Sequence, residues 1–201
     1  MSIWTSEQGR VRAHAFRTLL GLGMMALAGC LAVPVEKKPQ AMAAVAFYDG
    51  DVVVTGPRGY CVDAASVRRG ASGSFALMAS CVSLGQTGGV YADPAVMTVS
   101  VLARAASTQK PDAQAMARAL APAKVRVAQD DEGLALVQVM QGGDAALPGG
   151  DPVHWRAGLV INGHLVGLAV YGPAGQGVSG SDGQALLQAL ARAMRAASPK
   201  S

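Results

Sequence analysis

The pattern of apolar and polar positions predicts a series of short strands along the chain. Residues 52–54 and 75–79 are apolar or β-branched runs bounded by turn-forming residues. Residues 97–101 alternate apolar and polar side chains, which is the period of a strand with one buried face. Residues 125–127 begin a further strand, and residues 134–140 are apolar enough for a strand that is buried on both faces.

The strongest local signal is that of a hairpin. Residues 155–161 and 164–171 are two apolar runs separated by Asn162 and Gly163. Asn-Gly is the favoured pair in a type I′ turn, where both central residues need a positive φ. The two runs should therefore be antiparallel neighbours. A second, polar turn is predicted at residues 130–133, where the sequence is Asp-Asp-Glu-Gly.

Two segments carry helix signals. Pro111 and Asp112 open an alanine-rich segment that closes at Pro122, and a proline beside an acidic residue is typical of a helix N-terminus. Ser181 and Asp182 are cap candidates for a second helix near the end of the chain. That helix should pack on the sheet through one apolar stripe, formed by Leu186, Leu187, Leu190, Ala191 and Met194.

This order of elements predicts an α+β fold, with a mainly antiparallel sheet and two helices packed on it. Over residues 97–197 the order resembles the Mog1/PsbP-like fold, whose C-terminal half is likewise a run of antiparallel strands followed by a helix. Members of that group are mostly accessory or binding proteins. The resemblance therefore implies a binding role, without assigning a site.

The first 35 residues have the organisation of an export signal. A basic region containing Arg10, Arg12 and Arg17 precedes the uncharged run 18–35. A run of this length is also near the lower limit for a transmembrane anchor, although glycines and a proline interrupt it. Within the run, Leu27-Ala28-Gly29-Cys30 is similar to the lipobox of bacterial lipoproteins.

The resemblance to the lipobox implies a lipid anchor. In that family the cysteine thiol, here that of Cys30, carries diacylglycerol, and the amino group freed by cleavage is acylated. Three acyl chains suffice for stable membrane attachment. Leu31 follows the cysteine, in place of the aspartate that resembles an inner-membrane retention signal in enterobacterial lipoproteins. We therefore expect the outer membrane, with the domain facing the periplasm.

This interpretation divides the chain into three parts. Residues 1–29 are the signal peptide, and residues 30–44 are the lipidated cysteine with a tether. Residues 45–201 form a single α+β domain, because the 172 residues that remain after the signal peptide are enough to build one core and too few for two large domains. Within it, 45–90 is a disulfide-fastened section and 97–197 contains the sheet and the helices.

Cys61 and Cys81 remain after Cys30 is lipidated, and two cysteines in an oxidising compartment predict a disulfide. The alternative is a pair of buried free thiols. No histidine lies between or beside the two cysteines, and they do not form a Cys-x-x-Cys motif. We therefore expect a structural bridge and neither a metal site nor a redox centre.

The sequence around these cysteines carries a second resemblance. Residues 56–63, Gly-Pro-Arg-Gly-Tyr-Cys-Val-Asp, and residues 75–81, Phe-Ala-Leu-Met-Ala-Ser-Cys, are similar to a pattern in uncharacterised lipoproteins of alphaproteobacteria. This resemblance implies no activity.

The charge of the domain argues against nucleic-acid binding. Without the first 29 residues the chain has 14 basic and 12 acidic residues, and only two pairs of basic residues are adjacent, Lys37-Lys38 and Arg68-Arg69. A nucleic-acid-binding protein normally has a basic stripe with interleaved aromatic residues. The expected partners are the membrane, through the lipid anchor, and a protein of the envelope.

Few residues are candidates for catalysis or ligand binding. Ser179 lies in Gly-Val-Ser-Gly-Ser, which has Ser181 where a nucleophile elbow needs its last glycine. Residues 130–132 are more typical of a solvated turn than of a cation site. Residues 172–177 are more typical of a flexible connection than of an anion site. We expect no cofactor.

The two histidines after the signal segment, His154 and His164, are not expected to share a metal ion. If Asn162-Gly163 is the turn, about 23 Å separates them at roughly 3.3 Å per strand residue. Two zinc ligands must both lie about 2.0–2.1 Å from the ion. We place His154 at a strand end and His164 beside an exposed turn.

These observations favour a non-catalytic, membrane-anchored envelope lipoprotein that acts as a binding or accessory module. One alternative is a lipid-anchored serine hydrolase that uses Ser179 or Ser181 with a histidine and an acid. Another is a carrier of a small apolar ligand, with a pocket between the sheet and a helix.

Overall fold

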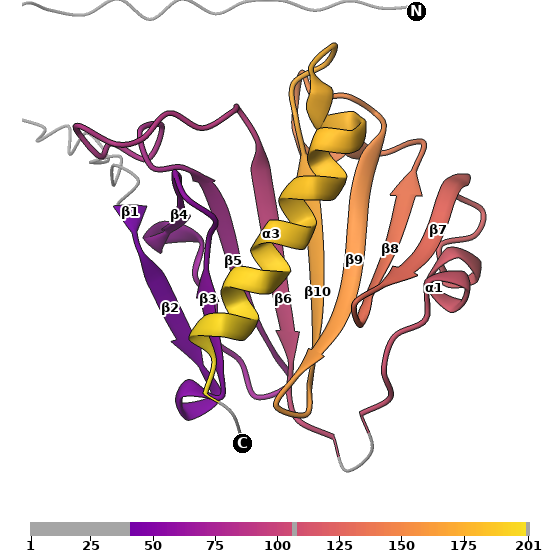
Figure 1. Cartoon of the computed structure of the whole chain (residues 1–201), viewed down its shortest axis with the longest axis horizontal. Coiled ribbons are helices and arrows are strands. Elements are labelled where there is room, and N and C mark those ends of the chain that lie inside the picture. The colour runs from indigo at the N-terminus through magenta and orange to yellow at the C-terminus, as the bar shows by residue number, and fades with distance from the viewer. Residues whose placement is uncertain (1–40, 106–107, 200–201) are drawn as a thin grey trace, which may run out of the picture. The chain divides into compact units, whose positions relative to one another are not determined.

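The structure is a computed structural model that describes residues 41–105 and 108–199 (Figure 1). In this part of the chain eight strands form one sheet in the order β1-β4-β5-β6-β10-β9-β8-β7, and every neighbouring pair is antiparallel. A separate hairpin pairs β2 with β3. The strands are β1 (Ala41–Met42), β2 (Ala44–Phe47), β3 (Val52–Thr55), β4 (Tyr60–Asp63), β5 (Gly73–Ser80), β6 (Val96–Leu102), β7 (Val125–Asp131), β8 (Leu134–Val139), β9 (His154–Ile161) and β10 (His164–Tyr171).

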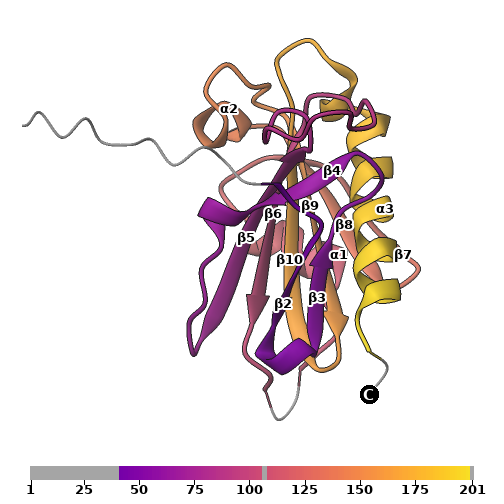
Figure 2. The same cartoon turned by 90° about the vertical axis from the view of Figure 1, so that its left-hand side faces the viewer.

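Two of the helices are those that the sequence predicts. They are α1 (Ala113–Ala119) and α3 (Ser181–Ala197), and the single-turn helix α2 (Gly143–Ala146) lies at the upper end of the sheet in Figure 2. Three 3-10 turns complete the elements, η1 (Tyr48–Gly50), η2 (Ala64–Ser66) and η3 (Gly177–Ser179). The α+β fold with a mainly antiparallel sheet is confirmed.

The main core lies on one face of the sheet, beneath α3 and the β2–β3 hairpin, which lie beside each other in Figure 1. Alternate residues of the strands point into it, as the period of two predicts. On β6 and β10 these are Met97, Val99, Val101, Val166, Leu168 and Val170. The stripe of α3 that meets them is formed by Leu187, Leu190, Ala191 and Met194, each at most 1% exposed. Leu186, at its margin, is partly buried.

Strand β8 is buried on both faces, as its uninterrupted apolar run predicts. Leu134 and Leu136 belong to the main core, whereas Ala135, Val137 and Val139 pack against α1. Since successive side chains of a strand alternate between faces, α1 lies on the face opposite α3. The sheet is therefore covered on one face by α3 and the small hairpin, and on the other by α1 at the β7–β8 end.

The predicted hairpin is confirmed, and with it the register of the sheet centre. Asn162 and Gly163 have φ of 48° and 80°, which is the left-handed conformation that a type I′ turn requires. The pairing begins at His164 and Ile161 and continues to Val170 and Trp155.

Three details differ from the sequence-based expectation. Pairing starts at Ala41, so the last residues of the predicted tether 30–44 belong to the domain, because β1 finds its partner in β4. The acidic run extends β7 to Asp131, and only Glu132-Gly133 forms the turn. Neither Ser181 nor Asp182 caps α3, since its N-cap is Gly180 without a side-chain hydrogen bond. Asp112 does cap α1, accepting a hydrogen bond from the Ala115 amide at 2.6 Å.

Cys61 and Cys81 form a disulfide, as expected. Cys61 lies on β4, and Cys81 directly follows β5, the neighbouring strand. A small buried cluster surrounds the bridge, formed by Leu84 with Ala41 and Ala79. The bridge therefore ties the first strands of the sheet to the loop after β5.

We expect that replacing both Cys61 and Cys81 by alanine lowers the free energy of unfolding by about 3 kcal/mol, since the bridge closes a loop of 20 residues in the unfolded chain. Urea unfolding in the absence of reductant measures this loss. Adding reductant should lower the unfolding midpoint of the native protein and leave that of the double variant unchanged. Equal midpoints for the two unreduced proteins would contradict the prediction.

Candidate functional site

The face of the sheet opposite α3 is only partly covered, and its centre is hollow. The register aligns residues of β9, β10 and β6 in rows across this face. Arg156 pairs with Ala169, and Ala169 pairs with Thr98. Each row places side chains of three strands next to one another, although they are far apart in the sequence.

The next row has almost no side chains. Gly158 pairs with Gly167, which pairs with Ser100. A Cβ atom at Gly167 would meet nothing within 4 Å, whereas one at Gly158 would lie 3.1 Å from Met116 Sδ and from Pro111 Cβ. The two glycines thus form a floor at which the sheet surface is low, and the start of α1 forms one wall.

Two hollows share this floor, with volumes of about 260 Å³ and about 270 Å³. Ser100, Met116, Ala157 and Gly167 line both, so the hollows are adjacent. We refer to them together as the open-face groove. Its lining is completed at one end by Thr98, Arg156, Leu168, Ala169 and Tyr171, and at the other by Leu102, Pro111, Gly158, Leu165 and Val166.

The two ends of the groove differ in chemistry. One end has the guanidinium of Arg156 and the hydroxyl groups of Thr98 and Tyr171, and the other is lined by Leu102, Leu165 and the proline and methionine of the α1 wall. Leu102, the last residue of the central strand β6, is 48% exposed, which is unusual for a large apolar side chain. The groove is therefore amphipathic along its length.

Arg156 is held by a buried histidine. Its Nε donates a hydrogen bond to His154 Nε2 at 3.2 Å, and His154 Nδ1 lies 3.3 Å from the carbonyl oxygen of Pro152. The imidazole also stacks on the ring of Tyr171, with centroids 5.0 Å apart. A ring that accepts at Nε2 and donates from Nδ1 is neutral.

Burial keeps His154 in this neutral form. Desolvation is the largest effect and lowers the pKa of its imidazole, and the positive charge of Arg156 lowers it further, while the bond to Pro152 acts in the opposite direction. Among the described residues, no carboxylate lies within ion-pair distance of Arg156. The guanidinium is thus oriented by a neutral partner, and no carboxylate of the described residues pairs with it at the edge of the groove.

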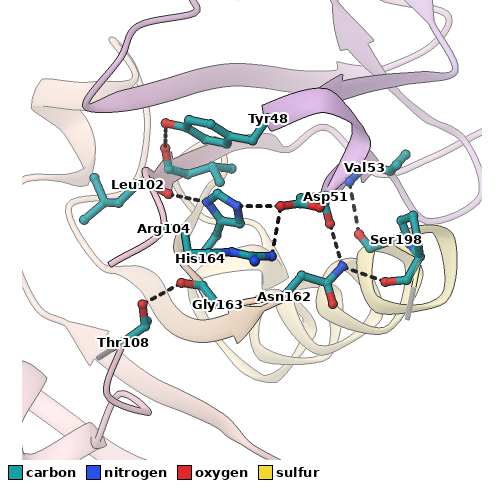
Figure 3. A network of polar contacts seen from close by, with 12 residues as sticks. Tyr48, Asp51, Val53, Leu102, Arg104, Thr108, Asn162, Gly163, His164 and Ser198 are labelled. Carbon is teal, nitrogen blue, oxygen red and sulfur yellow. Dashed lines mark hydrogen bonds and ion pairs between the residues drawn. The ribbon is translucent and has the colours of Figure 1, made fainter. Parts of the chain in front are cut away.

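His164 belongs to a different network, at the other end of the hairpin (Figure 3). Its Nδ1 lies 2.8 Å from the carbonyl oxygen of Leu102, and its Nε2 lies 3.2 Å from Asp51 Oδ2. Tyr48 stacks on the ring at 4.5 Å between centroids, and Arg104 Nη2 donates to the same Asp51 oxygen at 3.0 Å. His164 flanks the hairpin turn as expected, but the residue is 2% exposed and the turn is half-buried, so the expected exposure to solvent is wrong.

This network connects four separate parts of the chain. Asn162, in the hairpin turn, donates from Nδ2 to the carbonyl oxygens of Asp51 and Pro199 at 2.8 Å and 2.6 Å. Ser198 accepts a bond from the Val53 amide at 3.0 Å (Figure 3). The contacts join the β2–β3 hairpin, the β9–β10 turn, the end of β6 and the end of α3. No buried side-chain nitrogen or oxygen among the described residues lacks a hydrogen-bond partner, which is the arrangement of a structural clamp.

Four other polar residues singled out in the sequence form hydrogen bonds within the protein. Ser179 Oγ donates to the Gln176 carbonyl at 3.5 Å, and Ser181 Oγ donates to the Asp182 carboxylate at 3.4 Å. Neither serine hydrogen-bonds to a histidine within residues 41–105 and 108–199. Of the acidic run, Asp130 accepts from the Ala113 amide and Asp131 from Gln188, so these two carboxylates hold helices against β7. Cys30 lies outside the described residues.

The open-face groove was not predicted from the sequence. Gly158 and Gly167 stand at equal distances from the centre of the Asn162-Gly163 turn, so a type I′ hairpin pairs them across the two strands. Two facing glycines in apolar strands are a signal of a gap in the side-chain layer. The facing glycines can be recognised in the sequence, whereas the contributions of β6 and α1 to the groove depend on tertiary structure.

No family model matches this chain, and no curated protein and no solved structure matches it either. The resemblances to bacterial lipoproteins and to the Mog1/PsbP-like fold therefore stay predictions.

We expect Asp51→Asn to lower the free energy of unfolding by about 1–2 kcal/mol, because the charge-assisted bonds of the carboxylate to His164 and Arg104 are weakened. Asp49→Asn is the matched control, since Asp49 lies two residues earlier and is exposed. Asparagine tolerates the left-handed backbone of position 49 as aspartate does. Equal urea midpoints for the two variants would show that the clamp does not stabilise the fold.

The lowered pKa of His154 predicts a specific pH dependence. Below the unfolded-state pKa of 6.5, His154 binds a proton in the unfolded chain, whereas in the folded protein it does so only at lower pH. The free energy of unfolding therefore falls as the pH falls. We expect His154→Gln to remove this contribution to the pH dependence, because glutamine does not titrate and still offers Arg156 an acceptor. Urea unfolding at about pH 7.5 and about pH 5.5 measures the change in the free energy of unfolding. An unchanged slope in the variant would refute the assignment.

Proposed function

We propose that the protein is a non-catalytic lipoprotein of the cell envelope, anchored through Cys30, and that its domain is a binding or accessory module. The observation that carries the binding role is the open-face groove, a hollow lined by β6, β9, β10 and α1 on a sheet face that α3 does not cover. Ligand sites are concave, mostly apolar and equipped with a few polar groups. The groove has this composition, with Arg156 as its charged group.

The start of the domain supports attachment near a membrane. Eleven positions separate Cys30 from Ala41, so the intervening chain spans at most about 40 Å. Ala41 packs against the disulfide cluster, and the loop after Cys81 exposes Val82, Val90 and Tyr91, the last at 81%. Exposed aromatic and apolar side chains favour the interface of a bilayer. The outer membrane, with the domain in the periplasm, is the proposed location.

Among the helices of the described residues, none has the length and apolar character needed to cross a bilayer. The proposal assigns attachment to the acyl chains on Cys30, which would make the anchor stable without a spanning helix. It includes the membrane and an envelope protein as partners and no nucleic acid.

A carrier of a small ligand is the second candidate function, and the groove favours it directly. The sequence-based version placed an apolar pocket between the sheet and a helix, without naming the helix. Beneath α3 that space is filled by the main core, with Leu187 and Leu190 fully buried. The carrier hypothesis therefore uses the groove between the sheet and α1, on the opposite face.

Lipidation gives the proposal its first test. Cys30→Ser should yield an uncleaved precursor without acyl chains, because the thiolate is the nucleophile for lipid transfer and a serine hydroxyl ionises far less readily. Intact mass spectrometry of protein from the membrane fraction measures the N-terminus and the acyl mass.

The double variant Cys61→Ala, Cys81→Ala is the matched control, since it loses two sulfur atoms and keeps Cys30. It should be cleaved and acylated like the native protein. A native protein that begins at another residue and carries no acyl mass would overturn the anchor.

A further inference from the structure

We propose that the open-face groove binds the anion of a single-chain fatty acid, with the carboxylate on Arg156 and the acyl chain over the Gly158–Gly167 floor toward Leu102 and Leu165. The proposal rests on the binding role proposed above and names its ligand class. It does not depend on the identity of any protein partner.

The head of the ligand is assigned by the free hydrogen-bonding capacity of Arg156. The only hydrogen bond of its guanidinium to another described residue is that from Nε to His154, which leaves both terminal nitrogens for a ligand. A carboxylate fits such a planar fork with two oxygens. Thr98, in the same cross-strand row, and Tyr171 line this end of the groove and add hydroxyl donors.

The charge of the lining favours a carboxylate over a phosphate monoester. Arg156 is the one charged residue among those that line the two hollows, all of which lie in the described part of the chain. A carboxylate carries a single charge, which one guanidinium offsets. A phosphate monoester carries about −1.5 to −2 at neutral pH and would be left with uncompensated charge.

The tail is assigned by the rest of the lining. From Thr98 to Leu102 the groove follows β6 for about 13 Å, at roughly 3.3 Å per residue. Beyond the glycine floor its lining is apolar, with Leu102, Leu165, Pro111 and Met116. Together the two hollows lie in the lower half of the roughly 300–1,000 Å³ of ligand pockets, which suits one acyl chain and not two.

The glycine floor explains why an acyl chain can lie in the groove. A side chain at position 167 would stand in the space shared by both hollows, and nothing in the protein occupies that space within 4 Å of a Cβ there. Gly167→Leu therefore places a side chain in the groove without a clash at its Cβ atom. A fatty acid and the leucine side chain would compete for one volume.

The experiment uses the full chain in lipid nanodiscs and a dodecanoate that carries a photoreactive diazirine on its acyl chain. Labelling is measured against concentration, and the labelled residues are mapped by mass spectrometry. We expect saturable labelling at Met116 or at Leu165. Arg156→Gln should weaken apparent binding at least about tenfold, through loss of the charged bond, and Gly167→Leu should abolish it.

Arg118→Gln is the matched control, because Arg118 is an exposed arginine on α1 that does not line the groove. It should bind like the native protein. Circular dichroism verifies that each variant is folded. If Arg156→Gln fails to fold, the Gly167→Leu variant decides by itself, since a Cβ atom at this position meets nothing within 4 Å.

Competition with unlabelled amphiphiles tests the head group. Dodecanoate should displace the probe, whereas dodecanol and dodecyl phosphate should do so much less. Equal displacement by dodecanol would overturn the role of Arg156, and preferential displacement by dodecyl phosphate would overturn the carboxylate. Labelling that is equal in all variants, or that maps to Val82 and Tyr91, would overturn the site while leaving the lipid anchor at Cys30 intact.

Discussion

The register set by the Asn162-Gly163 turn is the constraint on which the rest of the structure depends. A shift of one residue would turn every side chain of β10 to the other face, burying Leu165 and exposing Leu168. The observed register sends Val166, Leu168 and Val170 into the main core. The same register aligns Gly158 with Gly167 on the opposite face, so the core and the groove are two consequences of one pairing.

The clamp around His164 holds that turn in place. Asp51 contacts both the imidazole and Arg104, and Asn162 bonds to the backbone of Asp51 and of Pro199. The turn is thereby tied to the β2–β3 hairpin and to the end of α3, which together cover the main core. At the other end of the hairpin, His154 orients Arg156 from the buried side. The polar groups at the turn end of the hairpin thus form the clamp, and those at its other end belong to the proposed binding site.

Local signals sufficed for much of the fold. The hairpin, the two-faced burial of β8 and the buried stripe of α3 follow from turn chemistry and periodicity within one segment. Strands β1, β2 and β4 escaped prediction because they are short and find partners only in the folded sheet. His164 was expected beside solvent, since its burial depends on Tyr48 and Asp51, more than 100 residues earlier. The groove likewise combines segments that no local pattern connects.

The proposed ligand site lies on the sheet face opposite α3. Methyl NMR of the full chain in nanodiscs, with ¹³C-labelled methionine methyl groups, tests it most directly. Met116 lines the groove, whereas Met97 and Met194 are buried in the main core on the other face. On titration with dodecanoate, the Met116 methyl should shift in a saturable way while the Met97 and Met194 methyls stay in place. An unshifted Met116, or equal shifts of all three, would contradict the claim.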